Sequence, residues 1–172
     1  STDPDCGNTL TEIRRYFHTL KGSGRMIGAK SSAELAWTIE DLLNKVISNK
    51  IIINNEIKTL VQIVLCIYKE CLIHDFRKRQ EHNIDLRVYI SLGQVLQHGK
   101  TLDKNWILLL EFLSEFDFSK QNIDQAIYQF IDQNEYLKND REKSLDINVS
   151  SNINNYINIY THIKGTKYSI TY

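Results

Sequence analysis

Apolar residues recur at steps of three and four over most of this chain, and this spacing constrains the fold more than any other feature. The first stripe lies within residues 10–27 and contains Leu10, Ile13, Phe17, Leu20, Gly24 and Ile27. Similar stripes follow in residues 31–47, 55–72, 86–96, 103–113 and 119–131. This spacing places apolar side chains on one face of an α-helix. The sequence therefore predicts an all-α protein whose helices pack as antiparallel neighbours.

Capping signals indicate where these helices begin and end. Thr9-x-x-Glu12 and Ser31-x-x-Glu34 have the spacing of a capping box, and Gly28 follows the first stripe. We therefore expect a first helix at about residues 9–28 and a second helix from Ser31. Polar residues that can cap the later helices are Asn54, Asp85, Asp103 and Ser119.

The helical spacing also suggests how the chain is divided. We expect a helical domain in residues 1–100 and additional helices in residues 101–132. From about Gln133 the spacing decays, and an Asn- and Ile-rich stretch follows, so residues 133–172 are predicted to be a weakly structured or strand-prone tail. The chain begins at Ser1 and its single methionine is the internal Met26, so we expect it to be a piece or a truncated relative of a longer protein.

Composition excludes several classes of partner. Lys and Arg together number 21, as do Asp and Glu, so the formal net charge is zero and neither nucleic acid nor an anionic membrane is implied. Apolar runs stay shorter than a membrane helix needs, and no signal peptide opens the sequence. The three cysteines have no C-x-x-C spacing, and we expect Cys66 and Cys71 in the core. A cytoplasmic location fits these features best.

The polar side of the first helix carries the residues with the clearest chemistry. His18 lies outside the apolar stripe, with Arg14 four residues before it, Lys21 three after it and Arg25 seven after it. An exposed neutral imidazole can attack a phosphoryl group, and neighbouring cations can take up the charge on the phosphate oxygens. Taken alone, the pattern fits equally a surface histidine in a cationic patch without chemistry.

Two glycines in the same helix need a reason, because each costs about 1 kcal/mol relative to alanine. Gly24 lies on the apolar stripe, where it allows close packing of a second helix. Gly22 lies on the polar side, where the absence of a side chain leaves room for a docking partner.

The segment His18-Thr-Leu-Lys21-Gly22 resembles the H-x-x-K-G core of histidine-containing phosphotransfer (HPt) domains. The longer run RRYFHTLKGSGRMIGA, followed by ELAWTIEDLLNKV, resembles the HPt repeats of CheA-like hybrid kinases that serve type IV pilus chemosensing. The resemblance extends over roughly residues 9–100 and is sharpest from 13 to 47. It implies a four-helix bundle whose first helix precedes the histidine-bearing one. That helix is apparently missing here, and the fourth helix, a second copy of the chain or an upstream segment could replace it.

The resemblance also implies roles for single residues. His18 would be the phosphoacceptor, Lys21 would stabilise the phosphate, and Glu40 would orient His18 from an antiparallel second helix through Nδ1, which leaves Nε2 as the nucleophile. A solvated Glu40 is the plain alternative. Residues expected to contact a docking partner are Arg14, Gly22 and Arg25. His98, with three further histidines at positions 74, 82 and 162, has no comparable setting.

The expected function is a phosphorelay step and not autonomous catalysis. The sequence has no glycine-rich nucleotide loop, no resemblance to an ATP-binding kinase domain and no receiver-like alternation of strands and helices. The expected partners are a CheA-type kinase domain and a response-regulator receiver domain. No cofactor is expected in this chain, and Mg²⁺ would be bound by the partner. The alternatives are a degenerate HPt remnant that docks or dimerises without catalysis, and an unrelated helical adaptor whose basic face binds acidic peptides.

Overall fold

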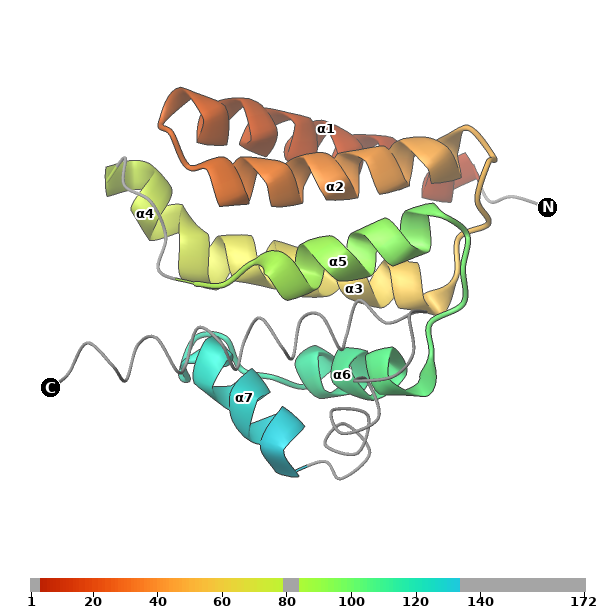
Figure 1. The fold of residues 1–172 in the computed structure, drawn as a ribbon. Coiled ribbons are helices and arrows are strands. Elements are labelled where there is room, and N and C mark those ends of the chain that lie inside the picture. The colour runs from red at the N-terminus through yellow and green to blue at the C-terminus, as the bar shows by residue number, and fades with distance from the viewer. Residues whose placement is uncertain (1–3, 79–83, 134–172) are drawn as a thin grey trace, which may run out of the picture. The chain divides into compact units, whose positions relative to one another are not determined.

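The computed structural model describes residues 4–78 and 84–133, and every regular element in these ranges is a helix (Figure 1). The prediction of an all-α protein is confirmed. Contacts divide the chain into two units, Ser1–Ser119 and Lys120–Tyr172. All but the first residue of the predicted tail at 133–172 lies outside the described residues. No helix in the described ranges has the length and apolar composition that a membrane crossing needs.

The first two helices form an antiparallel pair at the edge of the first unit. Helix α1 spans Pro4–Met26 and helix α2 spans Lys30–Ile47. They lie side by side in Figure 1, joined by a short turn in which Gly28 has a φ of +79°. Gly24 makes the close approach possible, since a Cβ atom there would lie 3.2 Å from Cβ of Ala33. The predicted packing role of Gly24 agrees with this contact.

Both predicted capping boxes are wrong. Helix α1 begins at Pro4, which suits the first turn of a helix, so Thr9 lies inside it. Helix α2 begins at Lys30 after Ala29, which makes no side-chain capping bond. Ala29 is fully buried and its carbonyl accepts from Ala33 N at 3.0 Å. Because the left-handed turn at Gly28 and the burial of Ala29 set the start of α2, a Ser31 cap is not used.

The third predicted helix is not a single continuous α-helix. Asn54 caps α3 (Asn55–Ile67) as predicted, and its Oδ1 accepts from Ile57 N at 2.9 Å. The chain continues through a π-helical turn, η1 (Tyr68–Leu72), into α4 (Ile73–Lys78). Tyr68 is buried, donates its hydroxyl hydrogen to the Ser32 carbonyl and packs edge-on against Phe17 with ring centroids 6.1 Å apart. The turn η1 thereby joins α3 to both α1 and α2.

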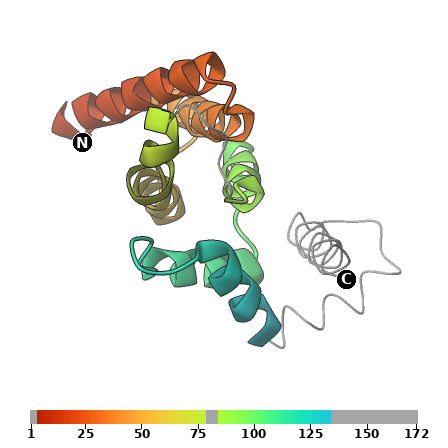
Figure 2. The ribbon, with the colours of Figure 1, turned by 90° about the vertical axis from the view of Figure 1, so that its left-hand side faces the viewer.

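Helix α5 (Arg87–Gln97) completes the bundle from within the chain. It packs against α2 and α3, and Figure 2 shows it beside α2 on the side away from α1. A Cβ atom on Gly93 would lie 2.6 Å from Cγ2 of Thr38, and Gln97 Nε2 donates to the Thr38 carbonyl at 2.7 Å. Of the three sources considered for a fourth helix, the described residues show the later helix of the same chain, packed against α2 and α3. Asp85 is not the N-cap residue of α5, because Leu86 occupies that position. Oδ1 of Asp85 still accepts a hydrogen bond from Arg87 N at 3.1 Å.

The additional helices predicted after residue 100 are present. Helix α6 (Lys104–Ser114) packs against α3, and Asp103 caps it as predicted by accepting from the amides of Asn105 and Trp106 at 3.0 Å. In the second unit, α7 spans Ile123–Gln133. Ser119 does not begin this helix, because its hydroxyl donates to Asp117 Oδ1 at 2.6 Å. Asn122 accepts from Gln125 N at 3.1 Å instead.

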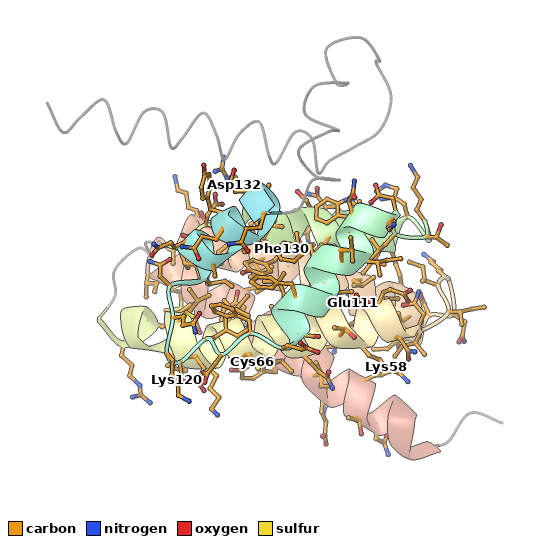
Figure 3. The ribbon with its side chains drawn as sticks, turned by 90° about the horizontal axis from the view of Figure 1, so that it is seen from below. Lys58, Cys66, Glu111, Lys120, Phe130 and Asp132 are labelled. Atoms are coloured by element: carbon orange, nitrogen blue, oxygen red, sulfur yellow. The ribbon has the colours of Figure 1, made fainter. Side chains whose placement is uncertain are left out.

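The prediction that Cys66 lies in the core is wrong. Its neighbours on the helix surface, Gln62 and Lys69, are exposed, and Cys66 is exposed with them beside the buried stripe of α3. Figure 3 labels Cys66 on α3 and Glu111 on α6. Between the two helices lies a groove of about 450 Å³, lined by Cys66 together with Thr59, Gln62, Ile63, Leu65, Leu113, Ser114, Phe116 and Phe118. Cys71 is half-buried.

Candidate functional site

The rotation of α1 sets which of its side chains face solvent. Phe17 is fully buried against Tyr68, and this anchor turns the next residue, His18, outward. The His18 side chain is 64% exposed. A partner protein can therefore reach the imidazole without any change in the helix.

The pairing of α1 with α2 brings Glu40 to His18. In an antiparallel pair, residues before a contact on one helix face residues after that contact on the other. Gly24 of α1 lies against Ala33 of α2. His18, six residues before Gly24, accordingly contacts Glu40, seven residues after Ala33. Nδ1 of His18 lies 2.8 Å from Oε1 of Glu40. Because an ionised carboxylate can only accept a hydrogen bond, Nδ1 carries the proton and Nε2 carries the free electron pair.

Lys21 occupies a different position from the one predicted. It was expected on an exposed face with His18, but its side chain is only 16% exposed and its Nζ lies 2.6 Å from Oε2 of Glu40. The carboxylate thus has one oxygen on the imidazole and the other on the lysine. Sequence reasoning missed this ion pair, although the same antiparallel register that joins residues 18 and 40 also brings residue 21 close to 40.

The three residues predicted to dock a partner lie in different surroundings. Arg14 is half-buried, and its Nη1 lies 4.0 Å from Oε1 of Glu40. Gly22 is exposed, and a Cβ atom there would have no neighbour within 4 Å. Arg25 is exposed. The space at Gly22 is compatible with docking, and the docking role of all three residues stays a prediction.

Glu40 is the buried centre of this cluster, with a side chain only 7% exposed. Burial by itself raises the pKa of its carboxyl, but the contacts with Lys21 and His18 outweigh burial and hold the pKa below its ordinary value of 4.5. The carboxylate is therefore charged at neutral pH. It can stabilise positive charge that develops on the imidazole while Nε2 reacts.

The described side chains include one histidine besides His18. His98 is exposed, and its Nδ1 contacts the Gln94 carbonyl at 2.7 Å. The side chains at positions 74, 82 and 162 lie outside the described residues. Among the described side chains, no group of three His, Cys, Asp or Glu residues is placed to hold a metal ion.

Comparison with known proteins finds similarity over the helices that carry this site. Residues 5–64 match the family model of the Hpt domain, a range that contains all of α2 and most of α1 and α3. The chain is also similar to the chemotaxis protein CheA of Borreliella burgdorferi, with 33% identity over 70 residues. That alignment covers 41% of this chain and 8% of the CheA sequence. No solved structure matches the chain. The matches support an Hpt domain that includes His18, Lys21 and Glu40.

Proposed function

We propose that this chain is a phosphotransfer intermediate in a two-component signalling relay, with His18 as the phosphoacceptor. The observation that carries the proposal is the contact of Nδ1 with Glu40 at 2.8 Å, which leaves Nε2 of an exposed imidazole free to react. The Hpt match over residues 5–64 supports the same chemistry. The chain relays a phosphoryl group and depends on partner proteins for the rest of the reaction.

The loading step needs only one reactive atom from this chain. The electron pair of Nε2 attacks phosphorus in line, the Nε2–P bond forms, and the bond from phosphorus to the donor oxygen breaks with its electron pair on that oxygen. The donor is ATP on a kinase domain or an aspartyl phosphate on a receiver domain. The ring becomes cationic, and its Nδ1–H remains hydrogen-bonded to the Glu40 carboxylate. In the onward step an aspartate oxygen attacks phosphorus and the neutral imidazole leaves.

The cations of α1 act on the phosphoryl oxygens. Lys21 lies one turn after His18 and stabilises the transferred group, and the exposed Arg25 adds positive charge on the same side. Mg²⁺ is supplied by the receiver or kinase domain, as the chemistry of aspartyl phosphate and ATP requires. Gly22 leaves space where the partner approaches.

The partners we propose are a CheA-type kinase domain and the receiver domain of a response regulator. The similarity to a chemotaxis CheA favours a chemosensory pathway, and the sequence resemblance set out above favours the type IV pilus branch. The location we propose is the cytoplasm, where such kinases and regulators meet.

The test is transfer of phosphate to the isolated chain. Incubation with a phosphorylated receiver domain, or with a CheA-type kinase domain, ATP and Mg²⁺, should label the chain with acid-labile, base-stable phosphate. His18→Gln should abolish the label, and His98→Gln, which alters another exposed histidine, should not. Label that persists in His18→Gln would move the site elsewhere. A chain that takes no label from any donor would favour the non-catalytic docking alternative.

A further inference from the structure

Two cations and the neutral imidazole of α1 surround one buried carboxylate. Glu40 has His18 and Arg14 near Oε1, at 2.8 Å and 4.0 Å, and Lys21 near Oε2 at 2.6 Å. Its side chain is 7% exposed, so water compensates little of its charge. A buried carboxylate that loses its partner is strongly destabilised, and the arrangement therefore depends on which cation holds Glu40 at each stage of the reaction.

Lys21 has two roles that compete. In the resting structure its ammonium group contacts Glu40. After transfer, a phosphoryl group with a charge of roughly −1.5 to −2 is attached to Nε2 of His18, one helical turn away. The ammonium group is a compact point charge on a flexible stem, and the phosphoryl oxygens attract it away from Glu40.

We propose that Arg14 is a positioning residue that takes over the Glu40 carboxylate when Lys21 turns to the phosphoryl group. This inference rests on the proposed phosphotransfer function. Arg14 lies one turn before His18, and its Nη1 is about 1 Å beyond charge-assisted hydrogen-bonding distance from Oε1. A guanidinium group has five donors in a planar fork and stays charged, which suits it to a carboxylate in low-dielectric surroundings.

The exchange of cations has a consequence for onward transfer. While Glu40 stays charged, it holds the proton on Nδ1 of the phosphorylated ring. The attacking aspartate then displaces a neutral imidazole, and the electron pair of the Nε2–P bond returns to Nε2. Without Arg14, departure of Lys21 would leave the Glu40 carboxylate with the Nδ1–H of the phosphorylated ring alone, and the positive charge of that ring is offset by its own phosphoryl group. Either Lys21 then stays with Glu40 or the carboxylate takes up a proton. Both outcomes slow transfer.

The first experiment needs no phosphate. Carboxyl ¹³C NMR can follow the titration of Glu40 in the wild type, Arg14→Gln, Lys21→Met and the double variant. We expect the pKa of Glu40 to rise in every variant, because each removes a cation. The rise in the double variant should exceed the sum of the rises in the two single variants by about one pH unit, because in each single variant the remaining cation substitutes for the lost one. A double variant that titrates like Lys21→Met alone would overturn the inference.

The second experiment measures onward transfer to a receiver domain and keeps Lys21 in place. We expect Arg14→Gln to be about 10-fold slower, which equals about 1.4 kcal/mol, and Arg14→Lys to recover most of the loss. Arg15→Gln is the matched control, because it removes the same charge from the next residue, which is exposed. It should transfer at the wild-type rate.

The two possible failures give different results. A wild-type chain that takes up no phosphate overturns the proposed function and this inference with it. If the chain is phosphorylated but Arg14→Gln transfers as fast as Arg15→Gln, the proposed function stands and only the role of Arg14 is overturned. Circular dichroism of each variant separates lost helix from lost transfer.

Discussion

Replacement of Glu40 by glutamine tests the centre of the site with little change in shape. The substitution keeps an oxygen that can accept from Nδ1 of His18, but it removes the negative charge that also pairs with Lys21. The amide can also rotate and offer its NH₂ group to Nδ1. That orientation favours the tautomer with the proton on Nε2, in which the nucleophilic electron pair is lost.

The geometry sets the size of the effect. The Nδ1 to Oε1 distance of 2.8 Å lies in the range of charge-assisted hydrogen bonds. Such bonds contribute about 1.5–3 kcal/mol net, against about 0.5–1.5 kcal/mol for neutral ones. Because His18 is 64% exposed, solvent screens part of this difference and the lower end, about 1 kcal/mol, applies. Loading makes the ring cationic, so we expect Glu40→Gln to load phosphate about 5-fold more slowly, and more slowly still if the tautomer changes.

Two measurements on the same protein check this expectation. Single-turnover phosphorylation gives the rate, and ¹H–¹⁵N correlation spectra of the ring nitrogens give the tautomer of His18. Asp41→Asn is the control, because it makes the same charge change one residue later in α2, where Asp41 pairs with Lys45 at 3.2 Å. Equal rates and tautomers in Glu40→Gln and wild type would refute the argument that the carboxylate controls the imidazole.

Four further predictions concern stability. Gly22→Ala should raise the free energy of unfolding by up to about 1 kcal/mol in urea unfolding, because its Cβ meets no atom within 4 Å, and it should slow phosphotransfer if a partner docks there. Gly24→Ala should lower the free energy of unfolding by about 1 kcal/mol in the same assay, because its Cβ would lie 3.2 Å from Cβ of Ala33 in α2. Gly93→Ala should lower the free energy of unfolding by about 1–3 kcal/mol, because the added Cβ would lie 2.6 Å from Cγ2 of Thr38. Combining it with Thr38→Ser, which removes Cγ2, should recover most of the loss. No recovery would locate the strain elsewhere. Since the pKa of Glu40 is lower in the folded state, its stabilising effect is present above about pH 5 and is lost as pH falls through the folded pKa. The difference in the free energy of unfolding between wild type and Glu40→Gln should therefore shrink from pH 7 to pH 3. A constant difference would contradict a lowered pKa of Glu40 in the folded state.

The sequence by itself determined the elements that depend on local interactions. Apolar spacing located the helices, because each must bury one face. Asn54 and Asp103 were correctly predicted as caps because a short polar side chain there reaches amides of its own first turn. The outward position of His18 also followed from spacing, since His18 lies outside the apolar stripe of steps of three and four that contains the buried Phe17.

The tertiary structure decided everything that depends on how helices meet. The capping boxes at Thr9 and Ser31 were wrong because a preceding proline and the buried turn at Ala29 set the helix starts instead. Spacing within one helix could not show that α5 closes the bundle, because that contact joins residues far apart in the chain. The same reason explains Lys21: its place on α1 was predictable, but only the register of α1 against α2 turned an expected surface cation into the partner of a buried carboxylate.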